Sequence, residues 1–108
     1  MADLKLFVDS KNLLKRIEFL QFVFFEAAEK ASEKELNIVL STVISDLNEN
    51  SYLQKLAIER MMDLIFFGKL KPRQALALLI DNWQSVDLSL NTIRIKSLYY
   101  LFEYEKKI

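Results

Sequence analysis

Glycine and proline are almost absent from this chain, and their scarcity constrains the fold more than any other feature of the sequence. They occur once each, as Gly68 and Pro72, whereas an average protein of this length carries about seven glycines and five prolines. Folds built from β-strands need such turn-forming residues at nearly every hairpin. The sequence therefore predicts an all-α protein whose helices are joined by short polar connections.

The composition allows one hydrophobic core and excludes most catalytic chemistry. Of the 108 residues, 52% are hydrophobic and 28% are charged, and a chain of this length buries about two-thirds of its unfolded surface. Cysteine and histidine are absent, so there is no thiol nucleophile, and the commonest general base and metal ligand are missing. A single glycine excludes the glycine-rich loops that hold nucleotide phosphates. We therefore expect one non-enzymatic domain over residues 1–108, without catalytic residues, cofactor, metal or small-molecule substrate.

Neither a secretory leader nor a membrane span is expected. The N-terminal segment carries an acidic residue, Asp3, where a signal peptide is basic. No apolar run approaches the roughly 18 residues that a membrane span requires. The absence of cysteine fits a reducing compartment. We expect a cytoplasmic protein.

Capping signals divide the chain into five predicted helices. Ser32 and Glu35 have the spacing of a capping box, in which each side chain accepts a hydrogen bond from the backbone N–H of the other. Ser51 and Gln54 repeat that spacing. The predicted helices cover about residues 11–30, 33–47, 52–67, 72–84 and 88–106, and their short connections make each antiparallel to the one before.

Four further positions support these boundaries. Gly68 stands where a left-handed residue ends a helix, and Pro72 suits the first turn of the next helix, where its missing N–H costs nothing. Asp9-Ser10 and Asp87 are predicted to cap the first and the last helix.

Apolar positions recur along the chain with the period of a helix pair. Five apolar positions of helix 11–30 match five of helix 52–67 at an offset of 39 residues, and these match five of helix 88–106 at an offset of 37. The pair Ile93-Arg94 also matches an apolar–arginine pair near the start of the second helix of HEAT repeats. The pattern resembles HEAT and armadillo-like repeats, which stack helical hairpins into a solenoid. The resemblance implies a fragment of such a solenoid, and the alternative fold is a compact helical bundle.

The predicted helices differ in how their apolar residues are distributed around the helix axis. In helices 33–47 and 72–84 these residues fill one arc, which is typical of outer helices. Helices 11–30, 52–67 and 88–106 are apolar on two sides, and residues 4–8 are expected to fold back over the second side of helix 11–30. In helix 88–106 one stripe comprises Leu88, Ile95, Leu98, Tyr99 and Phe102, and the opposite stripe comprises Leu90, Ile93, Tyr100, Leu101 and Tyr104.

A helix that is apolar on two sides must be covered on both, and aromatic residues carry much of the binding energy at protein interfaces. We therefore expect a protein–protein interaction module, used as an adaptor, regulatory or scaffold subunit, that binds another protein or forms a homodimer. The candidate contact residues are Tyr99, Tyr100, Tyr104, Phe19, Phe22 and Val23.

Two other functions stay open. Residues 63–70, followed by another helix, are similar to small helical immunity proteins, which implies an inhibitor that binds a toxin or an enzyme. Nucleic-acid binding would need a local basic surface, because fifteen Lys and Arg residues balance fifteen Asp and Glu residues and leave no overall attraction for phosphates. The basic residues available for it are the predicted loop cluster Lys69, Lys71 and Arg73, together with Arg94 and Lys96.

Overall fold

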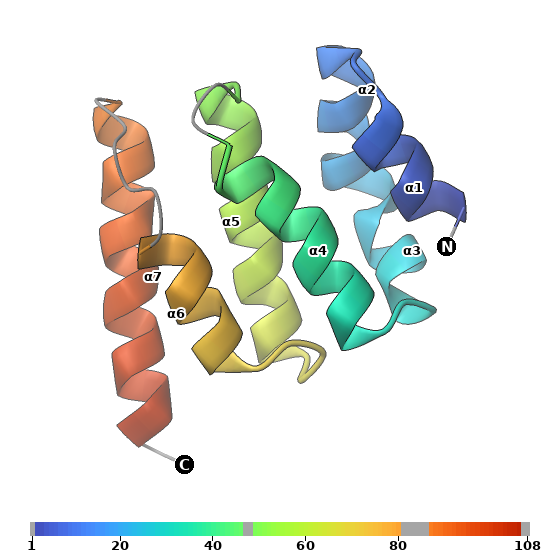
Figure 1. Cartoon of the computed structure of the whole chain (residues 1–108). Coiled ribbons are helices and arrows are strands. Elements are labelled where there is room, and N and C mark those ends of the chain that lie inside the picture. The colour runs from blue at the N-terminus through green and yellow to red at the C-terminus, as the bar shows by residue number, and fades with distance from the viewer. Residues whose placement is uncertain (1, 47–48, 81–86, 107–108) are drawn as a thin grey trace.

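The computed structural model describes residues 2–46, 49–80 and 87–106, and every regular element within these ranges is helical (Figure 1). The prediction of an all-α protein is therefore confirmed. The elements are α1 (Ala2–Asp9), α2 (Leu13–Glu18), the π-helix η1 (Phe19–Val23), α3 (Phe24–Glu29), α4 (Glu33–Ile44), α5 (Ser51–Phe66), α6 (Pro72–Ile80) and α7 (Leu88–Lys106).

The helices form two layers, and the chain alternates between them (Figure 1). α1, α4 and α6 lie in the front layer, while the continuous rod α2–η1–α3, α5 and α7 lie behind. Within the back layer α5 contacts both the rod and α7, and α4 contacts both α1 and α6 in front. The molecule measures 36 × 33 × 19 Å, which is about two helix diameters thick. As a result, α7 and the rod lie at opposite ends of the back layer.

The N-terminal segment is itself a helix, so the prediction of five helices was incomplete. α1 buries Leu4 and Phe7, and the ring of Phe7 stacks on that of Phe19 with 5.0 Å between centroids. The next helix starts at Leu13, and its N-cap is Asn12. Asp9, which the sequence predicted as part of this cap, belongs to α1 instead. This segment does fold back over the rod, as expected, and it does so as a helix.

A π-helix interrupts the predicted helix 11–30. In η1 the backbone makes a wider turn, which changes its hydrogen-bond pattern. Arg60 of α5 supplies a donor at this place, since its Nε donates to the Leu20 carbonyl at 2.7 Å while its Nη1 bonds to Asp63 at 2.9 Å. A side-chain pattern based on 3.6 residues per turn does not predict this interruption, because the apolar positions stay at almost the same spacing.

The N-caps of α4 and α5 differ in how well the sequence predicted them. The capping box of α4 is present, with Glu35 N–H donating to Ser32 Oγ at 3.1 Å and Ser32 N–H donating to Glu35 Oε1 at 3.2 Å. The predicted pair of Ser51 and Gln54 at α5 is wrong. Asn50 caps α5 instead, because its side-chain oxygen accepts from the two backbone N–H groups at the start of the helix at 2.9 and 3.1 Å.

Gly68 ends α5 in the left-handed conformation that its position predicted. Its φ is +76°, its N–H donates to the Ile65 carbonyl at 3.1 Å, and the N–H of Lys69 donates to the Leu64 carbonyl at 2.8 Å. These two bonds form a Schellman motif. Pro72 begins α6, as predicted, and the end of the predicted helix 72–84 lies outside the described residues.

Gln54 is buried beneath the C-terminal end of α4, which explains why it does not cap its own helix. Its side chain is only 6% exposed, and its Nε2 donates to the carbonyl of Asp46 at 2.7 Å and to that of Val43 at 3.2 Å. Carbonyl groups at a helix C-terminus lack partners within the helix. Gln54 therefore satisfies the end of α4 from the neighbouring helix.

Arg94 joins α7 to the same place. It is 2% exposed, its Nη2 donates to the Ile44 carbonyl at 3.3 Å, and its Nη1 donates to the Leu79 carbonyl in the last turn of α6 at 2.7 Å. Burial lowers the pKa of Arg94, but an arginine remains protonated in proteins. A positive charge is favourable at helix C-termini, so one guanidinium fastens α7 to α4 and α6.

Replacing Arg94 is expected to destabilise the fold strongly. Arg94→Met keeps most of the apolar volume but leaves the Ile44 and Leu79 carbonyls buried with these donors missing, so we expect the free energy of unfolding in urea to fall by about 2–4 kcal/mol. The exposed Arg73 on α6 provides the control, and Arg73→Met is expected to change the free energy of unfolding by less than about 0.5 kcal/mol. Equal losses for the two variants would contradict the role assigned to Arg94.

The capping box of α4 makes a second prediction, on the acidity of Glu35. Hydrogen bonds from the backbone N–H and the side chain of Ser32 hold the pKa of Glu35 below its usual value of 4.5. Because the lowered pKa belongs to the folded state, this stabilisation is complete above about pH 4.5 and is lost as the pH falls through the folded-state pKa.

In an NMR titration of the side-chain carboxyl, Ser32→Ala is therefore expected to raise the pKa of Glu35 towards 4.5. Ser41→Ala is the matched control, because the Ser41 hydroxyl donates to the Ile38 carbonyl in the middle of the same helix. A pKa that moves equally in both variants would show that the capping box is not the cause.

Candidate protein-interaction surfaces

α7 has one buried side and one exposed side, although both are apolar. On the inner side Leu90 and Leu101 are at most 1% exposed, and Ile93 packs against the core. On the outer side four residues at intervals of seven, four and three form a single line along the helix, which we call the α7 stripe. Its members and their exposed fractions are Leu88 (81%), Ile95 (57%), Tyr99 (69%) and Phe102 (55%).

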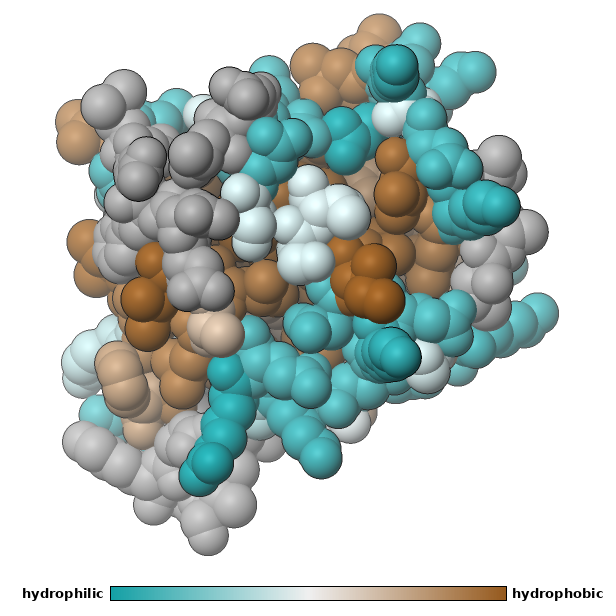
Figure 2. Space-filling view, viewed as in Figure 1, coloured by the Kyte–Doolittle hydropathy of each residue, from teal (hydrophilic) through white to brown (hydrophobic). Residues whose placement is uncertain are grey.

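The α7 stripe lies at an edge of the molecule. In Figure 1 α7 forms the left edge, and Figure 2 shows hydrophobic side chains along that edge next to the more hydrophilic front face. Leu98, which the sequence analysis assigned to the same stripe, is half-buried and packs against the core. The stripe is therefore narrower than predicted, and it runs from Leu88 to Phe102.

The three candidate tyrosines of α7 differ in position. Tyr99 is in the α7 stripe, whereas Tyr100 is half-buried and its ring lies 4.9 Å from that of Phe66 on α5. The side chain of Tyr104 lies outside the described part of the structure. Only Tyr99 is shown to be exposed, and Tyr100 instead connects α7 to α5.

The three candidates at the other end of the back layer also separate. Phe22 is 79% exposed and Val23 is 39% exposed, both in η1. Phe19 is half-buried, since Phe7 stacks on it and Phe24 meets its ring edge to face at 6.1 Å. α1 therefore covers part of Phe19, and its role as a contact residue stays a prediction.

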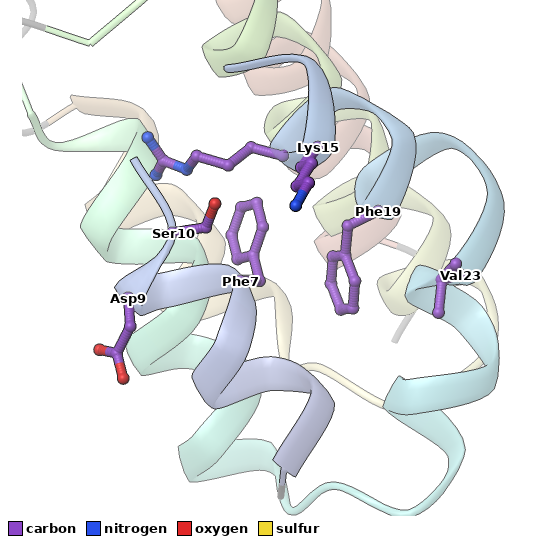
Figure 3. Close-up of a pocket in the computed structure, with 7 residues that line it drawn as sticks. Phe7, Asp9, Ser10, Lys15, Phe19 and Val23 are labelled. Atoms are coloured by element: carbon purple, nitrogen blue, oxygen red, sulfur yellow. The ribbon is translucent and has the colours of Figure 1, made fainter. Parts of the chain in front are cut away.

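A groove lies between α1 and the rod (Figure 3). It encloses about 440 Å³, and the rings of Phe7 and Phe19 face each other in it, with the Lys15 ammonium nearby and the Asp9 carboxylate pointing away. The guanidinium of Arg16 lies 5.1 Å from the centroid of the Phe7 ring and bonds to Glu49 at 2.7 Å. Because that charge already has a partner and Asp9 points away, we find no set of polar groups converging on a ligand in this groove.

Phe66 and Phe67 are exposed aromatic residues that the sequence analysis did not select as contact residues. Phe66 and Phe67, exposed by 59% and 71%, end α5 and point to different neighbours. Phe67 meets Phe25 of α3 edge to face at 5.9 Å, and Phe66 meets Tyr100 of α7. The signal for them was the pair of adjacent aromatic residues directly before Gly68, since neighbouring residues in the last turn of a helix cannot both face the core.

The predicted basic cluster is partly used within the fold. Lys69 Nζ donates to the Glu29 carbonyl at the end of α3, at 2.9 Å, and the backbone N–H of Lys71 donates to a Glu33 carboxylate oxygen at 3.1 Å. These bonds tie the α5–α6 connection to the α3–α4 connection and place a carboxylate among the basic groups. Lys71 and Arg73 are exposed, with the Glu33 carboxylate bound to the backbone of Lys71.

Arg94, proposed as a further contact for nucleic acid, is excluded from that role. It is buried against two helix ends, as described above, and a phosphate cannot reach it. Lys96, the other basic residue of α7 considered for nucleic-acid binding, is exposed.

Within the described ranges, no group of three or more His, Cys, Asp or Glu side chains is arranged to hold a metal ion. No described helix combines the length and the apolar composition that crossing a bilayer requires. Comparisons of the chain with protein-family models, curated proteins and solved structures gave no match. Function is therefore inferred from the exposed surfaces of the protein.

The two sides of α7 are expected to respond differently to substitution. Leu101→Ala on the inner side should lower the free energy of unfolding by about 2–4 kcal/mol, because it opens a cavity in the core. Tyr99→Ser on the outer side should change it by less than about 0.5 kcal/mol, measured in urea at a protein concentration below 1 µM or so to avoid association. A large loss for Tyr99→Ser would mean that the α7 stripe serves the fold of the single chain.

Proposed function

We propose that this chain is a non-enzymatic protein-interaction module, a short HEAT- or armadillo-like stack of helical hairpins that binds another protein through the α7 stripe. The observation that carries the proposal is the exposure of four large apolar side chains in one line on a helix whose opposite side packs against the core. An adaptor, regulatory or scaffold subunit would use such a surface.

The arrangement of the helices supports the solenoid interpretation. Three units follow each other along the slab, α1 with the rod, α4 with α5, and α6 with α7, each contributing one helix to each layer (Figure 1). In a solenoid each unit contacts mainly its neighbours, and the surface at either end resembles a cut through the core unless polar residues cap it. The α7 stripe is what an uncapped end would present.

Free energy considerations support binding at the α7 stripe. The chain does not need the stripe for its own core, which is built from other residues, including the inner side of α7. Covering apolar surface is favourable by about 25 cal/mol per Å², and Tyr and Phe contribute large areas at protein interfaces. Tyr99 adds a hydroxyl group, which allows it to be stable both exposed to water and in a contact.

The chemistry of the partner follows from the shape of the stripe. A line of apolar side chains on a single straight helix is complementary to another helix or to a shallow apolar groove, as in helix-in-groove recognition. Lys96 and Thr92 are exposed beside the stripe, so the edge of the contact is polar. We expect the bound element to be an amphipathic helix.

A photo-crosslinking experiment tests this function in cells. The Tyr99 position is replaced by a photoreactive phenylalanine analogue, and the matched control carries the same analogue at Ile38, which is 52% exposed on α4 in the other layer. We expect covalent protein adducts from position 99 and none from position 38, with the partner peptide identified by mass spectrometry.

Two results would contradict the proposal. The first is the absence of any protein adduct at position 99. The second is the same set of adducts at both positions, which would show only nonspecific contact.

A further inference from the structure

We propose that the α7 stripe binds the α7 stripe of a second copy of this chain, with the two helices antiparallel about a two-fold axis. This inference rests on the proposed function and specifies its partner. The internal repeat, the geometry of α7 and the charges beside the stripe support this pairing.

The internal repeat shows what kind of surface the stripe is. The offset of 37 residues that aligns α5 with α7 places Ile95, Tyr99 and Phe102 at the positions of Ile58, Met62 and Ile65. On α5, Ile58 and Ile65 are at most 1% exposed and Met62 is half-buried against the core. The stripe therefore repeats positions that are covered by packing when the helix has neighbours on both sides.

The covering neighbour on that side of α5 is α7 itself. Lys55 and Glu59 of α5 line one small cavity together with Ser89, Thr92 and Lys96 of α7, and Met62 lies one turn beyond Glu59 on the same side of its helix. α7 therefore lies along this side of α5. By the repeat, the equivalent side of α7 is suited to a neighbouring helix as well.

A second copy exposes apolar residues at both ends of its back layer, on the rod at Phe22 and on α7. A contact of the stripe with the rod would join two different surfaces and would not close after two copies. The inner side of α7 in the second copy is buried, so the surface left on that helix is the same stripe. A contact between identical surfaces is isologous and closes after two copies about a two-fold axis. This geometry yields a dimer and not an open fibre.

The charged residues beside the stripe favour the antiparallel direction. Lys96 and Glu103 are seven residues apart and therefore lie on the same flank of α7. In an antiparallel pair equal flanks of the two helices meet, so Lys96 of one copy can lie opposite Glu103 of the other, and the symmetry repeats the pair. In a parallel pair each flank meets the opposite one, and this match is lost.

The same register also interleaves the apolar side chains. When Lys96 faces Glu103 of the other copy, the two-fold axis passes between positions 99 and 100, so the two Tyr99 rings lie next to each other. Phe102 of one copy then falls between Ile95 and Tyr99 of the other. Side chains that alternate along a helix pair in this way pack as knobs into holes.

The size of the contact predicts a moderate affinity. α7 has 19 residues and is therefore about 28 Å long, and one pair of such helices is at the small end of specific interfaces. We expect a dissociation constant on the order of tens of micromolar.

Sedimentation equilibrium of the purified full chain tests the pairing. We expect a concentration-dependent dimer, and Tyr99→Lys should raise the dissociation constant about tenfold or more by placing a charge in the centre of the contact. Ile38→Lys is the matched control, since it adds the same charge at an exposed apolar position of α4, and it should leave the constant unchanged. Circular dichroism of each variant verifies that the fold is retained.

A charge exchange tests the antiparallel register. Lys96→Glu and Glu103→Lys should each raise the dissociation constant about threefold, as expected for ion pairs at the edge of a contact. An equimolar mixture of the two variants should recover the original affinity, because each mixed dimer contains the two opposite-charge pairs again. A mixture that associates no better than the single variants would overturn the register.

The inference as a whole fails if the chain remains monomeric at about 500 µM, or if Tyr99→Lys and Ile38→Lys weaken the dimer equally. This failure is distinguishable from failure of the proposed function. A monomeric chain that still forms crosslinks to a different protein from position 99 keeps the function and loses the self-pairing. Crosslinks from position 99 to peptides of the same chain support both.

Discussion

The hydrogen bonds of the buried Arg94 guanidinium determine which side of α7 faces the core, and the exposed surface of the protein depends on that choice. Apolar attraction is non-directional, and α7 is apolar on two sides, so hydrophobic burial alone does not select one of them. Arg94 lies on the inner side and donates to carbonyls at the ends of α4 and α6. Burying the opposite side would leave those carbonyls without these donors and would expose Leu90 and Leu101, while the α7 stripe would become core.

The same kind of contact recurs at two other places in the fold. Gln54 donates to carbonyls at the end of α4, and Arg60 donates to the Leu20 carbonyl in η1. In each case a long side chain from one helix satisfies backbone groups that a neighbouring helix leaves available, a role that water would have at an exposed helix end. These contacts are directional, so they fix how the helices are placed relative to each other, whereas the apolar core mainly supplies the free energy.

The candidate surfaces occupy the two ends of the slab because the middle helices have neighbours on both sides. At one end α1 folds over the rod and covers part of Phe19, leaving Phe22 exposed beside it. At the other end no described element covers the outer side of α7. Sequence periodicity located these residues as apolar, but it did not distinguish the partly covered Phe19 from the exposed Phe22, since both lie on a helix that is apolar on two sides.

The sequence by itself determined the helical class, the approximate helix positions, the capping box at Ser32 and the left-handed end of α5 at Gly68, because all of these depend on local spacing and on the backbone preferences of single residues. It also identified the two apolar stripes of α7. Only the tertiary structure decided that residues 2–9 form a helix over the rod, that η1 is a π-helix, that Gln54 and Arg94 bond to other helices, and which stripe of α7 is exposed. The physical reason is that these features depend on partners far away in the sequence, such as the 50 residues between Ile44 and Arg94, and periodicity along one helix carries no information about them.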